Sequence, residues 1–138
     1  MSLFKIFDIA GSAVSSQSQR LNTVASNLAN VDTVAGPDGK SYKARQVTFQ
    51  TVMMNTPDGA PAAGVKVAGV SEDQSPGRRV HDPASPSADA EGYVTYSNVN
   101  AVDEMVNMIS ASRSYQNNIE VMNTAKNLLM KTLQMGQG

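Results

Sequence analysis

The distribution of proline is the feature that most constrains this chain. All six prolines lie between Pro37 and Pro86, and seven of the ten glycines lie between Gly36 and Gly92. Proline breaks a helix interior because it lacks the amide hydrogen and its ring clashes with the preceding turn. The two proline-free ends can therefore form long helices, and the middle of the chain cannot.

The amino-terminal segment repeats apolar residues at alternating steps of four and three. Eight of nine such positions between residues 3 and 31 are apolar, and Gln17 is the exception. This spacing is the period of a coiled-coil seam. We expect Asn30 to help end the helix, because asparagine side chains bond exposed backbone groups at helix ends. The seam positions are Leu3, Phe7, Ala10, Val14, Gln17, Leu21, Val24, Leu28 and Val31.

The same alternation predicts a second long helix at the carboxyl-terminal end. Asn100 is suited to cap its amino terminus, and Asp103 and Glu104 in the first turn complement the helix dipole. We expect this helix to begin near Asn100 and to end near Gly136. Its seam positions, seven of nine apolar, are Met105, Met108, Ser112, Tyr115, Ile119, Met122, Lys126, Leu129 and Leu133.

The middle of the chain is expected to form short strands joined by turns. Residues 37–39 and 57–59 both have the sequence Pro-Asp-Gly, which favours a tight turn. The polar segment 71–91 contains three prolines, and it is predicted to be a long loop that contact with neighbouring molecules orders. Alternating apolar residues predict strands over residues 43–53, 64–70 and 92–96.

These elements predict a mainly α-helical protein with a small β module. The long amino- and carboxyl-terminal helices are expected to pair as a coiled coil, with a central insertion rich in β-hairpins. The chain has three Phe, four Tyr and no Trp, so its packing must depend on smaller aliphatic side chains. Helices of about 30 and 35 residues would project well beyond a compact sphere, so the molecule should be elongated.

The charge and composition exclude several classes of protein. Eleven basic and twelve acidic residues give a net charge of -1 without a basic stripe, which argues against a nucleic-acid partner. No apolar stretch approaches the length of about 18 residues that a spanning helix needs. Lys5 and Asp8 interrupt the opening segment, so we expect no cleavable secretory signal. The absence of cysteine excludes disulfides and thiolate metal sites.

The single histidine, His81, is the strongest candidate for a catalytic residue. It lies at residues 78–82 (Arg-Arg-Val-His-Asp) in the proline-rich segment, whereas catalytic groups need partners that converge from a rigid scaffold. Asp82, Asp89 and Glu91 offer oxygen ligands, but their spacing matches no known metal motif. We therefore predict no catalytic residue, no metal, no cofactor and no small-molecule substrate.

Motifs of small and uncharged polar residues occur near both ends of the chain. They are Gly11-Ser12-Ala13, residues 17–22 (Gln-Ser-Gln-Arg-Leu-Asn), residues 25–30 (Ala-Ser-Asn-Leu-Ala-Asn) and residues 110–116 (Ser-Ala-Ser-Arg-Ser-Tyr-Gln). These motifs resemble the terminal signatures of the bacterial flagellar axial proteins, the group of rod, hook and hook-associated subunits. Further in, residues 92–100 and 104–106, together with the short length, are similar to subunits of the proximal rod.

This resemblance implies a structural subunit of the flagellar proximal rod rather than an enzyme. It implies a helical core domain formed by residues 1–35 and 98–138, and a β-rich module formed by residues 36–97. The expected partners are copies of the same chain and other rod proteins in a helical assembly that transmits torque. Export by the flagellar type III apparatus without signal cleavage, and a periplasmic position near the inner-membrane ring, are also implied.

The residues expected to form the assembly interface combine the two seams with two asparagines, to which the resemblance gives a packing role. They are Leu3, Phe7, Val14, Leu21, Val24, Asn27, Leu28, Asn30, Met105, Met108, Tyr115, Ile119, Met122, Leu129 and Leu133.

The alternative from another class is a soluble adaptor or chaperone whose seams hold a partner's amphipathic helix. An enzyme built around His81 is a more distant alternative.

Overall fold

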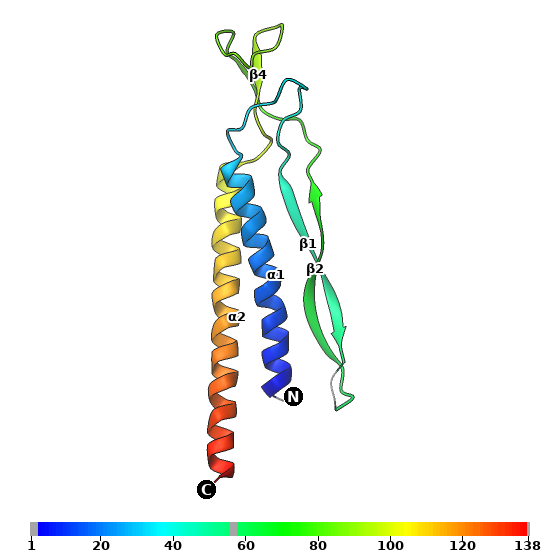
Figure 1. Ribbon diagram of the computed structural model, residues 1–138, viewed down its shortest axis with the longest axis vertical. Helices are drawn as coiled ribbons and strands as arrows, with labels where there is room; N and C mark the ends of the chain where they lie inside the picture. The colour runs from blue at the N-terminus through cyan, green and yellow to red at the C-terminus, as the bar shows by residue number, and fades with distance from the viewer. Residues whose placement is uncertain (1–2, 56–57, 138) are drawn as a thin grey trace.

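The computed structural model describes residues 3–55 and 58–137, and these residues form an elongated molecule (Figure 1). Two long helices lie side by side, and a long β-hairpin runs along one of them. A small hairpin lies beyond the end of the molecule at which the first helix ends and the second begins. The elements in chain order are α1 (Leu3–Ala29), β1 (Arg45–Met54), β2 (Ala62–Glu72), β3 (Arg79–His81), β4 (Tyr93–Thr95) and α2 (Ala101–Gly136).

Helix α1 is the central element of the molecule. It contacts α2 on one face and the β1–β2 hairpin on the other, so the helices and the hairpin run roughly parallel to one long axis (Figure 1). The carboxyl end of α2 extends past the amino end of α1, which leaves its last turns without a helix from the same chain beside them. The expected elongated shape and the two long terminal helices are confirmed.

The buried core is made of small side chains, as the shortage of aromatic residues predicted. Only alanine and valine are found among the buried hydrophobic residues of the described chain. Such short side chains let helix backbones approach closely but bury little apolar area per residue. The buried hydrophobic residues are Ala10, Val24, Ala44, Ala62, Val94, Ala111 and Ala125.

The predicted seam of α1 is largely confirmed by burial. Ala10 and Val24 are buried, and Phe7 is the one exposed position of the seam between residues 3 and 28, at 40%. The helix ends at Ala29, where the Asn30 Nδ2 group donates to the Ser26 carbonyl at 2.8 Å. The expectation that Asn30 helps to end this helix is therefore confirmed.

The seam predicted for α2 is wrong at every second position. The side facing α1 carries Glu104, Ala111 and Ala125, which are buried, whereas the predicted Met105 and Leu133 are 55% and 56% exposed. Two adjacent rows of α2 both contain apolar residues, so a count of apolar side chains could not separate them. The close approach of α1 selects the row with alanines. The more buried row is Glu104, Met108, Ala111, Tyr115, Asn118, Met122, Ala125 and Leu129, which shares Met108, Tyr115, Met122 and Leu129 with the prediction.

The amino-terminal cap of α2 is the one that the sequence predicted. The Asn100 side chain accepts hydrogen bonds from the amides of Val102 and Asp103, at 3.0 and 3.3 Å. These two amides have no partner inside the helix, and the cap satisfies them.

The two strands of the long hairpin were predicted to within two residues at every end. β1 pairs with β2 in antiparallel register, with Val47 opposite Val70 and Thr51 opposite Val65. The register shifts between Thr48 and Phe49, which leaves Ala68 of β2 as the extra residue of a bulge.

Both predicted tight turns contain a glycine in the left-handed region. Gly39 has a φ of 73° and Gly59 a φ of 69°, conformations that glycine adopts without steric cost. Pro57, the first residue of the second predicted turn, lies outside the described residues.

The prediction of a long loop over residues 71–91 is wrong for residues 71–72 and 79–81, and the expected ordering by neighbouring molecules stays a prediction. This segment contains the end of β2 and all of β3, which pairs with β4 so that Val80 lies opposite Val94. The Asp82 amide also donates to the Gly92 carbonyl at 2.9 Å. A strand of three residues between two prolines has too short a pattern to be recognised, because its pairing partner lies further along the chain.

Two serines of α1 hold the long hairpin through one residue of β2. The Val65 amide donates to Ser12 Oγ at 3.1 Å, and Ser16 Oγ donates to the Val65 carbonyl at 3.2 Å. Next to it, a Cβ atom on Gly64 would lie 2.9 Å from Ser12 Oγ and 2.8 Å from Met54 Sδ. Strand β2 can dock on α1 only because this position has no side chain.

We predict that Gly64→Val weakens the docking of the hairpin on α1. The added side chain must displace Ser12 and Met54, and overpacking of this kind costs about 1–3 kcal/mol. Gly69→Val is the matched control in the same strand, because a Cβ atom at that position would have no other atom within 4 Å. Thermal unfolding followed by circular dichroism measures both, and equal melting temperatures for the two variants would contradict the docking.

Candidate assembly surface

Asn27 connects the two helices to the start of the long hairpin. Its side chain is fully buried, and its Nδ2 group donates to the Arg45 carbonyl at 2.8 Å and to Glu104 Oε2 at 3.1 Å. Its Oδ1 atom accepts from the Tyr42 hydroxyl at 2.9 Å and from the Arg45 amide at 3.0 Å. Both donors and both acceptor sites of the amide are therefore used.

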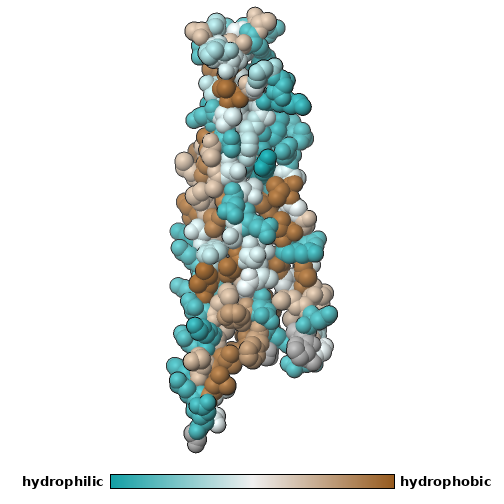
Figure 2. Space-filling model, viewed as in Figure 1, coloured by the Kyte–Doolittle hydropathy of each residue, from teal (hydrophilic) through white to brown (hydrophobic). Residues whose placement is uncertain are grey.

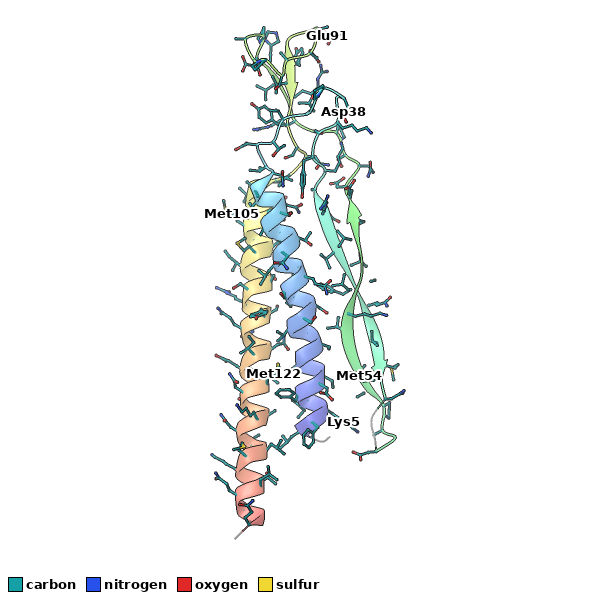
Figure 3. All side chains as sticks on the ribbon, in the orientation of Figure 1. Lys5, Asp38, Met54, Glu91, Met105 and Met122 are labelled. Atoms are coloured by element: carbon teal, nitrogen blue, oxygen red, sulfur yellow. The ribbon has the colours of Figure 1, made fainter. Side chains whose placement is uncertain are left out.

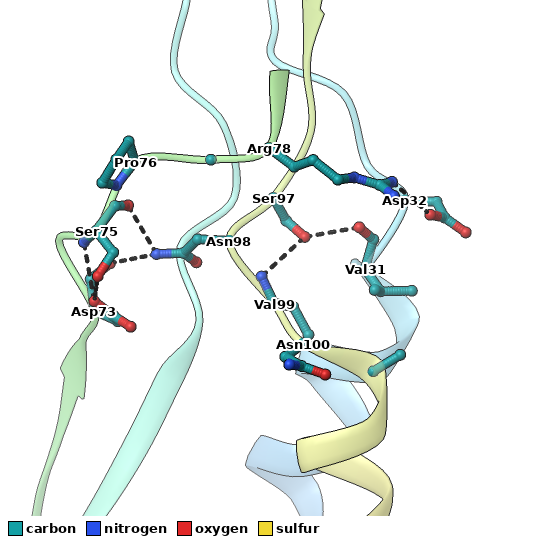
Figure 4. Close-up of a pocket in the computed structure, with 12 residues that line it drawn as sticks. Val31, Asp32, Asp73, Ser75, Pro76, Arg78, Ser97, Asn98, Val99 and Asn100 are labelled. Atoms are coloured by element: carbon teal, nitrogen blue, oxygen red, sulfur yellow. Dashed lines mark hydrogen bonds and ion pairs between the residues drawn. The ribbon is translucent and has the colours of Figure 1, made fainter. Parts of the chain in front are cut away.

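Asn98 connects the segment before α2 to the residues just before β1 and just after β2. Its Oδ1 atom accepts from the Ala44 amide at 2.6 Å, and its Nδ2 group donates to the Asp73 and Ser75 carbonyls at 2.8 and 3.0 Å. Close by, Ser97 Oγ donates to the Val31 carbonyl at 2.7 Å. Figure 4 shows the bonds of Asn98 to Asp73 and Ser75, and that of Ser97 to Val31, around an open cleft of about 670 Å³ at the junction of helices and hairpins.

The small hairpin holds the candidate catalytic residue in an exposed position. His81 packs edge-on against the Tyr93 ring, with 5.0 Å between ring centroids. Arg79 also lies against this ring, 4.6 Å from the Tyr93 centroid, and pairs with Asp89 at 3.0 Å and Glu91 at 3.6 Å. Two of the acidic residues considered as metal ligands are therefore engaged by an arginine. Within residues 3–55 and 58–137, no cluster of three histidine or acidic side chains could hold a metal ion.

The Asp89 carboxylate organises the turn at the tip. Its Oδ1 atom accepts from the amides of Tyr93 and Glu91, both at 2.9 Å. The Tyr93 bond is the main cause that lowers the pKa of Asp89 below the ordinary value of 3.8, while desolvation opposes it and the Glu91 amide and Arg79 add to the lowering. The ionised carboxylate thus stabilises the tip.

The residues predicted for the assembly interface fall into three groups. Val24 and Asn27 are buried inside the chain, and Phe7, Met105 and Leu133 are exposed. The remaining ten are partly buried: Leu3, Val14, Leu21, Leu28, Asn30, Met108, Tyr115, Ile119, Met122 and Leu129.

Several exposed apolar residues of the helices were missed by the sequence analysis. They lie on rows next to the predicted seams, so a search for a second apolar row on each helix would have found them. Figure 2 shows hydrophobic surface over the helices and at their free end, and Figure 3 shows Met105 pointing away from α1. The missed residues are Phe4, Val102, Val106, Ile109, Val121, Leu128, Met130 and Met135.

Two grooves flank the free end of the helix pair, which is the end that holds the amino terminus of α1 and the carboxyl-terminal half of α2. One has a volume of about 400 Å³ and is lined by Phe4, Phe7 and Leu129, among others. The second, of about 420 Å³, is lined by Val121 and Leu128, among others. Leu3 lines both grooves, so the end of the helix pair exposes apolar surface on two sides.

Neither helix of the described chain combines the length and the apolar character that a membrane crossing requires. The arrangement offers exposed apolar helix surface and no convergent catalytic groups among the described residues. Such a surface is suited to binding other proteins.

Comparison with known proteins agrees with a role in assembly. Residues 7–37 match the family model described as flagella basal body rod protein, and residues 90–135 match the model for the carboxyl-terminal region of the flagellar basal body rod FlgEFG proteins. The two matches cover most of both helices, and they define a flagellar basal-body rod protein.

Curated relatives narrow this class further. The chain is 58% identical to the flagellar basal-body rod protein FlgC of Escherichia coli O6:H1, and 57% identical to that of Salmonella typhimurium and of Yersinia enterocolitica. Each alignment covers 99% of this chain and 100% of the relative. The chain belongs to the FlgC family, and it is a structural subunit of the flagellar basal-body rod.

We predict that Asn27→Leu strongly destabilises the protein. The change leaves Glu104, the Tyr42 hydroxyl and both backbone groups of Arg45 without partners, so we expect a loss of about 3 kcal/mol or more. Asn22→Leu, at an exposed position of the same helix, should change stability by less than about 0.5 kcal/mol. Urea unfolding measures both variants, and similar midpoints would show that the buried amide is not needed.

We also predict that acid loosens the tip formed by β3 and β4. The stabilisation by Asp89 is present above its unfolded pKa of 3.8 and is lost as the pH falls through its lower folded pKa. The amide NMR shifts of Glu91 and Tyr93 should therefore titrate together with a midpoint below 3.8. Asp89→Asn should abolish this titration. A midpoint above 3.8 in the unaltered protein would contradict the assignment.

Proposed function

We propose that the chain builds the proximal part of the rod by helical assembly through the exposed and partly buried apolar residues of α1 and α2. The observation that carries this proposal is the apolar surface on both sides of the free end of the helix pair, where Phe4 is 66% and Leu133 56% exposed. Contacts of one molecule with different faces of the next do not close, and such contacts generate a filament.

The two seams support a coiled-coil arrangement of α1 and α2 in the assembled rod. The row of α2 that faces α1 keeps the alternating three- and four-residue spacing from Glu104 to Leu129. We infer that residues 1–35 and 98–138 act as the helical core of the subunit, and that residues 36–97 act as a β-rich module that contacts neighbours outside it.

The partners that we propose are other rod proteins and copies of this chain, brought together after export by the flagellar type III apparatus. The proposed location is the periplasm near the inner-membrane ring, where such a rod transmits torque.

The alternatives receive less support. An adaptor that holds a partner's helix is not favoured, because the relatives at 57–58% identity are named as rod proteins. We propose that the chain is not an enzyme, since His81 packs against Tyr93 at an exposed tip and no other titratable group completes a catalytic pair with it among the described contacts.

We predict that Leu28→Asp abolishes rods and motility in cells that lack their own copy, whereas His81→Ala leaves both unchanged. A carboxylate placed on the contact between the helices costs a few kcal/mol, and every subunit of the assembly repeats that defect. Ala25→Asp, at an exposed position of α1, is the matched control. Swarming in soft agar and electron microscopy of basal bodies provide the measurements. Normal rods with Leu28→Asp, together with lost motility in His81→Ala, would reverse the conclusion.

A further inference from the structure

The outer edge of β1 is an unused row of backbone hydrogen-bonding groups. Val65 points its amide and carbonyl at Ser12 and Ser16, away from β1, so its partner Thr51 also points its own groups away from the ladder. Alternation places Val47, Phe49 and Met53 in the same orientation. The register therefore turns the backbone groups of these four residues towards the outer edge of the hairpin and not towards β2.

The same alternation explains where this edge begins. At the first residue of β1, the Arg45 amide and carbonyl are both bonded to the Asn27 side chain. Asparagine therefore covers the top of the β1 edge, while the serines of α1 cover the lower part of the opposite β2 edge. The same alternation turns the backbone groups of alternate residues of β1 below Arg45, and those of Val67 and Val70 in β2, away from the partner strand.

The open part of β1 lacks the devices that normally prevent strands from pairing with other molecules. Residues 46–54 contain no charge, no proline and no glycine, and the extra residue of the bulge lies in β2 rather than β1. Natural proteins usually protect exposed edges with lysine, proline or a bulge. An unprotected edge of this kind is a template for β-augmentation by another strand.

The two open edges cannot satisfy each other within one chain, because they lie on opposite sides of a two-stranded sheet. The open β1 edge of one molecule can, however, form hydrogen bonds with the open β2 edge of a second molecule whose long axis points in the same direction. Strands β1 and β2 run in opposite directions, so β1 of one molecule and β2 of a neighbour meet in the antiparallel sense that the hairpin already uses. Val67 and Val70 are uncharged and suit a pleated contact with Phe49 and Thr51.

We propose that the open β1 edge, residues 47–53, pairs with the open β2 edge, residues 67–70, of a second copy of this chain. This inference rests on the proposed function, since a rod of one polarity brings the two edges together. The contact is heterologous and does not close, so repeated pairing extends a sheet from subunit to subunit around the helical core.

Site-specific photo-crosslinking in native rods tests which chain occupies the edge. A benzophenone amino acid at Thr51 should give a product of twice 14.6 kDa in which the crosslinked peptide contains residues 67–70. The same probe at Asp38, in an exposed turn, is the control and should not give this product. A Thr51 product with any other rod protein would overturn the assignment of a second copy, and so would a crosslink to a helix.

Amide hydrogen exchange tests the backbone pairing without a substitution. The amides of Phe49, Thr51 and Met53 point away from β2 in the free chain, and they should exchange at least about tenfold more slowly in purified rods. Gln50 and Val52 point towards β2 and are the internal controls, because their protection should change little. Unchanged exchange of the outward amides in rods that have assembled would overturn the inference while leaving the proposed function intact.

A proline variant tests pairing at the β1 edge without disturbing the fold of the monomer. Thr51→Pro removes an outward amide that the hairpin does not use, and we expect loss of rods with the monomer still folded by circular dichroism. Asn55→Pro, one residue beyond β1, should assemble normally. Normal rods with Thr51→Pro would count against the pairing, and failure of the unaltered chain to enter rods would instead count against the proposed function.

Discussion

The buried side chain of Asn27 is the interaction on which the rest of this structure depends. One amide group satisfies the start of β1, the Tyr42 hydroxyl and the Glu104 carboxylate, so it fixes α1, α2 and the long hairpin relative to one another at a single point. The hydrophobic core cannot do this, because alanine and valine bury too little area to define one arrangement. A fully bonded polar group supplies the specificity instead.

The same use of short polar and small apolar residues extends down the molecule. Ser12 and Ser16 hold the hairpin through the backbone of Val65, Asn98 joins the hairpin to the segment before α2, and small residues keep the backbones close. A molecule built in this way places few large side chains in its own interior. Its large apolar residues, such as Phe4, Ile109 and Leu133, remain at the surface, where a subunit of an assembly needs them.

Much of the fold could be read from local pattern. The absence of proline marked both helices, Asn30 and Asn100 marked two helix ends, and alternation marked β1 and β2. The predictions failed where contact with a distant segment decides. Every second position of the predicted α2 row lies one residue away from the row that faces α1, and β3 was missed because its pairing with β4 spans the tip. The candidate surface was also incomplete, since Val106 and Val121 lie on rows next to the predicted seam and only one row was searched for on each helix.

The sequence by itself determined both helices, the strands of the long hairpin and the class of protein. Helix-breaking residues, caps and apolar periods act over a few residues, so they can be recognised without a structure. The terminal motifs in addition resemble those of one family. Only the tertiary structure decided which asparagine is buried, which row of α2 meets α1, and which strand edges stay open. These features depend on contacts between segments many residues apart, as between Asn27 and Glu104. No local sequence pattern determines the distance at which two such backbones pack.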